Sequence, residues 1–156
     1  MPKFDSTQFV KSGLPLGGIG AGKLEIMPCG VLDNFTFLNN FQRPLTNSSE
    51  NETVGVLGYH FGIFYKDSKK KVAKLLQTTR VGKYPVIESI KFKGEFPFAC
   101  LDYQDSEIPL NISLEAYSAF IPKEEKNSCL PAAIFEFKIS NPSSRYADAA
   151  LLINIM

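Results

Sequence analysis

The chain is poor in the side chains that bind metals and form disulfides. Its single histidine is His60, and its three cysteines, Cys29, Cys100 and Cys129, lack the close paired spacing of a structural zinc site. An odd number of cysteines also does not make a disulfide framework. We therefore expect no bound metal, reduced thiols and a cytoplasmic location.

An excess of one charge and long apolar runs are absent as well. Lys and Arg number 17 against 16 Asp and Glu, a net charge of +1, which indicates neither a nucleic-acid partner nor an anionic membrane surface. No apolar run approaches the length of a transmembrane helix, and the first residues lead into no apolar export segment, so we expect no membrane span. The lysines at 69–71 follow Asp67 and Ser68 and predict the solvated tip of a hairpin.

Apolar and polar residues alternate through much of the chain with the period of a β-strand. Ile112, Leu114 and Ala116 fall on one face of such a strand, and Phe135 and Phe137 alternate with charged residues in another. Further strands are expected at residues 24–27, 54–66, 72–78, 86–93, 96–103 and 151–155. Residues 39–53 form the one long loop, and no long amphipathic helix is visible. The pattern predicts an all-β protein, an antiparallel β-sandwich or barrel, in one domain spanning 1–156.

Five glycines fall within residues 13–22, where the backbone must turn tightly or approach another group closely. The segment from Gly17 to Lys23 has the spacing of a nucleotide-binding loop, but Leu24 stands where that loop needs Ser or Thr. Residues 24–30 also indicate a strand and a turn instead of the helix that would face the phosphates. A dinucleotide pattern fails too, because Lys23 takes the place of its third glycine. A glycine-rich loop at the edge of a β-domain is the simpler interpretation.

The glycine-rich segment opens a series of collinear blocks that carry a family resemblance. The blocks are LPLGGIGAGK at 14–23, NFT at 34–36 with Asn39 and Asn40, GEFPF at 94–98 with Asp102 and Tyr103, IPLNISLEAYSAFIP at 108–122, NSCLPAAIF at 127–135 and NP at 141–142. Together they are similar to the opening of glycoside hydrolase family 116, which includes non-lysosomal glucosylceramidase and microbial β-glucosidases and β-xylosidases.

This resemblance implies an N-terminal β-sandwich that precedes an (α/α)6 barrel. In the family the nucleophilic Glu and the acid/base Asp of a retaining β-glycosidase belong to that barrel, and the reaction needs no cofactor. The chain of 156 residues is then similar to the first half of the sandwich, a fragment without the catalytic barrel. An incomplete sandwich has open sheet edges, from which we expect self-association.

A retaining glycosidase needs two carboxyl groups roughly 5 Å apart across the scissile bond. The candidates in this chain are Glu25, Glu88, Glu95, Asp102 and Glu115. Three of them, Glu25, Glu88 and Glu115, fit the polar face of alternating strands, and Glu95 and Asp102 fall near expected strand ends. His60 lies in an aromatic strand, where packing or solvation at a sheet edge explains it better than a role as base. We expect no catalytic residue here.

The resemblance also gives the glycine loop a functional interpretation. Gly17, Gly18, Ile19, Gly20 and Gly22 would lie close to substrate, at the mouth of the barrel's sugar site, because loops on a rigid scaffold often carry such roles. The alternative is a buried turn where only glycine fits.

Five aromatic residues also have two interpretations. They would form either a sugar-stacking platform or apolar packing in the core or between domains, and they are Phe96, Phe98, Tyr103, Tyr117 and Phe120.

The expected function is therefore that of an N-terminal β-sandwich of a retaining β-glucosidase or glucosylceramidase-like enzyme. It would support or shape the active site of a separate catalytic barrel, its partner, and would meet a β-glycoside only in the complete enzyme. The alternative is a free-standing carbohydrate-binding β-sandwich module. Coplanar exposed aromatic rings on one sheet face would favour the module, and a large apolar open edge would favour the first function.

Overall fold

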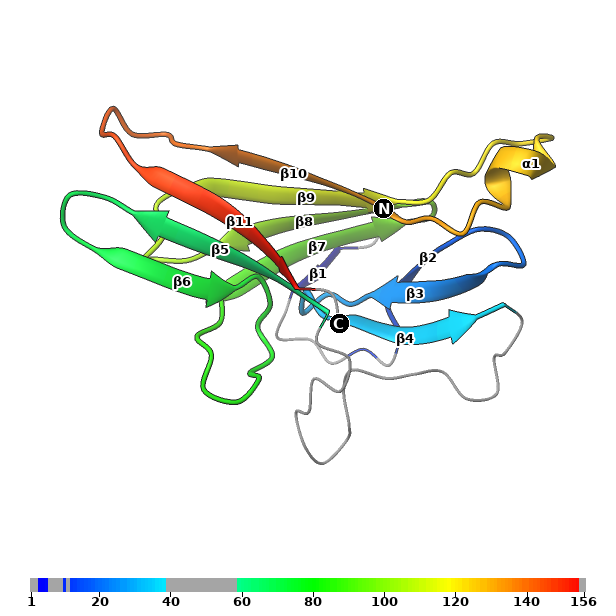
Figure 1. Cartoon of the computed structure of the whole chain (residues 1–156), viewed down its shortest axis with the longest axis horizontal. Helices are drawn as coiled ribbons and strands as arrows, with labels where there is room; N and C mark the ends of the chain where they lie inside the picture. The colour runs from blue at the N-terminus through cyan, green and yellow to red at the C-terminus, as the bar shows by residue number, and fades with distance from the viewer. Residues whose placement is uncertain (1–2, 6–9, 11, 39–58, 155–156) are drawn as a thin grey trace.

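The computed structural model describes residues 3–5, 10, 12–38 and 59–154, and shows β-sheets stacked in two layers. One layer is a five-stranded sheet, and two three-stranded sheets lie side by side to form the other (Figure 1). Every pairing between named strands is antiparallel. The predicted all-β sandwich class is confirmed.

The five-stranded sheet has the order β1-β7-β8-β9-β10. Its strands are β1 (Lys3–Asp5), β7 (Ser89–Glu95), β8 (Phe98–Gln104), β9 (Asn111–Tyr117) and β10 (Ile134–Ser140). The alternation that predicted β9 is confirmed, since Ile112, Leu114 and Ala116 are all buried. The expected strands at 86–93 and 96–103 begin three and two residues later, because Glu88 lies in a bend and Phe96 and Pro97 form the turn before β8.

The second layer consists of two sheets with the orders β11-β5-β6 and β2-β3-β4. The first contains β5 (His60–Lys66), β6 (Lys71–Leu75) and β11 (Asp148–Asn154). The second contains β2 (Leu14–Leu16), β3 (Gly22–Ile26) and β4 (Leu32–Phe37). A one-turn helix, α1 (Glu125–Ser128), interrupts the connection from β9 to β10.

The core lies between the two layers and draws on all three sheets. The ring of Phe61 on β5 packs against Phe135 and Phe137 on β10, each at a centroid distance of 5.1 Å. Gly30 lies where the sheets meet, with φ +85°, and a Cβ there would be 2.5 Å from the carbonyl oxygen of Leu76. Only glycine allows this backbone conformation together with this approach.

A buried ion pair also ties the layers together. The Lys74 ammonium on β6 bonds the carboxylate of Asp105, in the turn between β8 and β9, at 2.8 Å, and the carboxylate of Glu107 at 2.7 Å. Burial of Lys74 lowers its pKa, but bonds to these two carboxylates outweigh burial and raise the pKa above 10.5. The pair compensates a charge that would otherwise be costly in the core.

The predicted hairpin tip at 69–71 is confirmed in its essentials. The Asp67 carboxylate accepts the backbone N–H of Lys69 at 2.7 Å and that of Lys70 at 2.8 Å, while Lys71 already begins β6. The loop expected at 39–53, and the first part of the strand expected at 54–66, lie outside the described residues. Within the described ranges, no helix is long and apolar enough to cross a membrane.

Two buried tyrosines give a matched test of the core. Tyr103 Oη is buried with no hydrogen-bond partner among the described residues, whereas Tyr65 Oη donates to Asp67 at 2.9 Å. An unsatisfied buried hydroxyl is destabilising, so Tyr103→Phe should raise the free energy of unfolding by about 1 kcal/mol. Tyr65→Phe should lower it. Urea unfolding of both variants checks this, and a loss of stability in Tyr103→Phe would contradict the unsatisfied hydroxyl.

Candidate functional site

The glycine loop, residues 17–22, is a tight turn that joins β2 to β3. Its tip is a β-turn in which the backbone N–H of Ala21 donates to the carbonyl of Gly18 at 3.1 Å. Gly20 occupies the third turn position with φ +73°, as a type II turn requires. No atom lies within 4 Å of a Cβ built at Gly20. The positive φ of this residue, and not a lack of space for a side chain, therefore explains why glycine occurs here.

Close backbone contact explains the other three glycines of the loop. A Cβ on Gly18 would be 2.3 Å from the carbonyl oxygen of Leu130, and one on Gly17 would be 2.4 Å from that of Gly22. Gly22 has φ +104°, and its Cβ would be 2.4 Å from the carbonyl oxygen of Thr36. The loop therefore packs directly against the segment after α1 and against β4.

Two buried serines from the connection after β9 hold the loop in place. Ser118 Oγ accepts the backbone N–H of Gly17 at 2.6 Å, although the two residues are 101 positions apart. The carbonyl of Ser128 accepts the N–H of Ile19 at 2.9 Å, while its hydroxyl exchanges hydrogen bonds with the backbone of Ile121. Because its backbone is fixed on both sides, the loop presents the exposed Ile19 side chain from a rigid support.

Glu25 on β3 corrects an expectation from the sequence. The alternation of apolar and polar residues predicts that Glu25 lies on a solvated strand face. In the structure, however, Glu25 is only 3% exposed. Its carboxylate accepts bonds from the Ser12 hydroxyl, the Gly13 N–H, the Lys23 ammonium and the Asn34 amide. A register shift between Lys23 and Glu25 accompanies this arrangement and turns the carboxylate inward.

The same contacts set the ionisation of Glu25. Burial alone raises its pKa, but hydrogen bonds from Lys23, Asn34 and Gly13 together outweigh burial and lower the pKa below 4.5. The Lys23 ammonium is engaged by this carboxylate, and the segment after the loop is strand β3, as the sequence predicted in place of a phosphate-binding helix.

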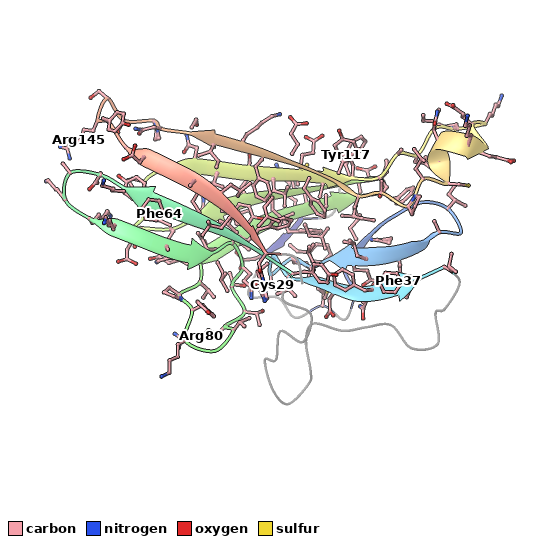
Figure 2. All side chains as sticks on the ribbon, viewed as in Figure 1. Cys29, Phe37, Phe64, Arg80, Tyr117 and Arg145 are labelled. Atoms are coloured by element: carbon pink, nitrogen blue, oxygen red, sulfur yellow. The ribbon has the colours of Figure 1, made fainter. Side chains whose placement is uncertain are left out.

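Exposed apolar side chains gather around the glycine loop. We call this region the glycine-loop end; it comprises residues 17–22, the end of β4, the turn between β7 and β8, and the connection from β9 to β10 (Figure 1). Its exposed side chains are Ile19, Phe37, Leu38, Phe96, Phe98, Phe120, Ile121, Leu130 and Ile134. Phe37 marks this end in Figure 2, and Arg145 marks the opposite end. A cluster of this kind is typical of a surface that another protein surface covers.

Comparison with protein families identifies the chain. The family described as "beta-glucosidase 2, glycosyl-hydrolase family 116 N-term" matches residues 13–156. The chain belongs to this family. Comparison with curated protein sequences gives no match.

The aromatic residues of this family 116 domain do not form a flat platform. The rings of Phe96 and Phe120 meet edge to face at 68°, and those of Phe98 and Tyr117 are tilted by 42°, each pair with centroids 5.4 Å apart. Tyr103 is buried in the core. The exposed rings therefore pack against each other and do not present the coplanar faces that stack on a sugar.

The five candidate carboxylates lie in separate places, with one exception. Asp102 pairs with Ser113 and Glu115 pairs with Cys100, so Asp102 and Glu115 are diagonal neighbours on the outer face of the five-stranded sheet. Asp102 is exposed on β8, two residues before the strand ends at Gln104. Burial and both carboxylates raise the pKa of the Cys100 thiol beside them.

The remaining candidates have structural contacts of their own. Glu88 accepts the N–H of Ser106 at 3.1 Å, and Glu95 ends β7. At the start of β5, His60 Nδ1 is hydrogen-bonded to Gln77 Oε1 at 3.0 Å. Within the described part of the chain, no three His, Cys, Asp or Glu side chains come together as metal ligands.

A hollow of about 710 Å³ lies away from the glycine loop. It is on the outer face of the β11-β5-β6 sheet and is lined by residues that include His60, Gly62, Tyr84 and Leu152. None of its lining residues belongs to the glycine-loop end. The hollow and the loop are therefore separate features.

The two glycines at the turn should respond differently to substitution. Gly18→Ala places a methyl group against backbone and should lower the free energy of unfolding by about 3 kcal/mol. Gly20→Ala meets no atom and should cost only about 1 kcal/mol, the strain of its positive φ. Gly20→Asn, which tolerates that conformation, is the control and should cost less. Urea unfolding measures all three, and equal losses at both glycines would contradict the assigned contacts.

Glu25 should make stability depend on pH in the acid range. Because the pKa of Glu25 is lowered in the folded chain, its contribution is complete above pH 4.5 and is lost as pH falls through the folded pKa. The stability difference between the native chain and Glu25→Gln should therefore be largest near neutral pH and shrink below pH 4.5. Urea unfolding across this pH range is the measurement. Asn34→Ala removes one of the hydrogen-bond donors to Glu25 and should show the same decrease at low pH more weakly. A stability difference that does not change with pH would contradict the lowered pKa of Glu25.

Proposed function

We propose that this chain is the β-sandwich that docks on the catalytic (α/α)6 barrel of a family 116 retaining β-glucosidase or glucosylceramidase-like enzyme. Its surface for the barrel is the glycine-loop end. The exposed Ile19, held on a fixed backbone in an apolar end, carries this proposal. A preformed apolar surface binds a partner at low entropic cost, because its backbone is already ordered.

In this proposal the chain itself has no catalytic residue. Retaining hydrolysis needs two carboxyl groups roughly 5 Å apart in an enclosed site, and the barrel supplies them. The one neighbouring pair described here, Asp102 and Glu115, lies on an outer sheet face among Lys91, Lys93 and Ser113. That mixed, solvated face supports a structural role for both carboxylates.

The glycine loop is proposed to reach the mouth of the sugar site. Gly20 is open to its surroundings, and Gly17, Gly18 and Gly22 hold the turn against the rest of the domain. The loop would thus bring Ile19 and the Gly20 backbone to a β-glycoside bound in the complete enzyme. The free-standing sugar-binding module receives no such support, since the exposed aromatic rings are not coplanar.

Location and assembly complete the proposal. The free thiols of Cys29, Cys100 and Cys129 suit a reducing cytoplasm. Among the described strands, β10 and β11 each end a sheet, and a strand at the end of a sheet suits self-association.

Calorimetric titration of the chain with a separately produced family 116 barrel tests the docking surface. Ile19→Asp should weaken binding at least about tenfold, because it places a charge within the apolar end. Tyr146→Asp is the matched control, since Tyr146 is exposed near the opposite end, and it should bind like the native chain. Absence of binding by the native chain, or equal weakening by both substitutions, would contradict the proposal.

In the complete enzyme, Gly20→Val at the equivalent position tests contact with substrate. An altered kcat/KM for a β-glucoside in a folded variant is expected, and unchanged kinetics would rule out the loop's role at the sugar site.

A further inference from the structure

Ser118 continues the buried face of β9 one step beyond the end of the strand. Ile112, Leu114 and Ala116 lie in the core, and Ser118 is the next residue of the same alternation and is only 4% exposed. Burying a hydroxyl is costly unless it is hydrogen-bonded, so a serine in the place of an apolar core residue indicates a polar role. Its oxygen accepts the N–H of Gly17, the first residue of the glycine loop, at 2.6 Å.

The position of Ser118 is fixed by the five-stranded sheet and not by the sheet that carries the glycine loop. It directly follows β9, which pairs with β8 on one side and with β10 on the other. On the residue before it, the ring of Tyr117, which Figure 2 labels, packs against Phe98. Two residues after it, the ring of Phe120 packs against Phe96. The acceptor oxygen is therefore held in place from both sides along the chain.

The glycine loop is closed on itself, and its orientation depends on contacts with the other layer. A Cβ on Gly17 would lie 2.4 Å from the carbonyl oxygen of Gly22, so the two ends of the loop touch. Two hydrogen bonds are described between this closed loop and the connection after β9. Ile19 donates to the carbonyl of Ser128, and Gly17 donates to the hydroxyl of Ser118. Of these two bonds, only the second depends on the identity of a side chain.

We propose that Ser118 is a positioning residue for the sugar site of the complete enzyme. Its hydroxyl holds the loop at Gly17 in the orientation that presents the backbone of Gly20 to a β-glycoside, and the buried Ser118 does not itself touch the sugar. This inference rests on the proposed role of the glycine loop and deepens it, because it names the residue that sets the substrate affinity of the loop. A preorganised loop binds more tightly than one that must be ordered on binding.

Amide hydrogen exchange followed by NMR tests the contact in the chain itself. Ser118→Ala removes the acceptor, and the amide of Gly17 should exchange about tenfold faster. Ser118→Cys keeps a side chain of similar size but offers only a weak sulfur acceptor, and it should give an intermediate increase. Tyr65→Phe is the control, because it removes a buried hydrogen bond far from the loop and should leave Gly17 exchange unchanged. Unchanged exchange in Ser118→Ala would overturn the positioning role.

In the complete enzyme, the same substitutions at the equivalent positions test the effect on substrate. Ser118→Ala should raise KM for a β-glucoside about tenfold and leave kcat nearly unchanged, because the loop would bind the glycoside without touching the reacting carboxyl groups. Ser118→Cys should raise KM by less, and Tyr65→Phe should leave KM unchanged. A general loss of stability would reduce the amount of active enzyme and would not raise KM, so the KM change distinguishes positioning from a merely structural role.

The outcomes separate this inference from the function on which it rests. Gly20→Val, measured in the same enzyme, reports whether the loop acts at the sugar site at all. If Gly20→Val alters kcat/KM and Ser118→Ala leaves KM unchanged, the loop keeps its role and the assignment of Ser118 is overturned. If neither substitution changes the kinetics, both proposals are overturned. Should Ser118→Ala fail to fold, as urea unfolding would reveal, Ser118→Cys takes its place, and an unchanged KM in that variant would overturn the assignment.

Discussion

Gly18 lies so close to the backbone after α1 that it has no room for a side chain, and the glycine-loop end depends on this contact. The carbonyl oxygens of Cys129 and Leu130 occupy the space that a Cβ would need. Hydrogen bonds from Gly17 to Ser118, and from Ile19 to Ser128, fix the same turn from both sides. Together these contacts join the β2-β3-β4 sheet to the five-stranded sheet and determine where Ile19 is exposed.

Two surfaces of the sandwich differ in chemistry: one is charged and the other is apolar. The outer face of the five-stranded sheet carries Lys91 beside Asp102 and is solvated by mixed charges. The glycine-loop end is apolar but rests on a rigid backbone.

Buried polar groups link separate strands and turns of this domain. Lys74 with Asp105 connects β6 to the turn between β8 and β9, and Glu25 connects β3 to Gly13 and Asn34. Each is a charge that folding removes from water, and each has enough partners to compensate for that loss. Such groups fix the relative positions of strands more narrowly than apolar packing alone.

The sequence by itself determined the class of fold, the family and most of the strands, because strand alternation and collinear motifs are local signals. Ile112, Leu114 and Ala116 could be assigned to a buried face from their spacing alone. Only the tertiary structure decided that Glu25 is buried, that Ser118 and Ser128 hold the glycine loop, and that β11 pairs with β5. The physical reason is the separation of the interacting residues along the chain. The hydrogen bond between Gly17 and Ser118 spans 101 residues, and no local sequence pattern indicates which distant strands become neighbours.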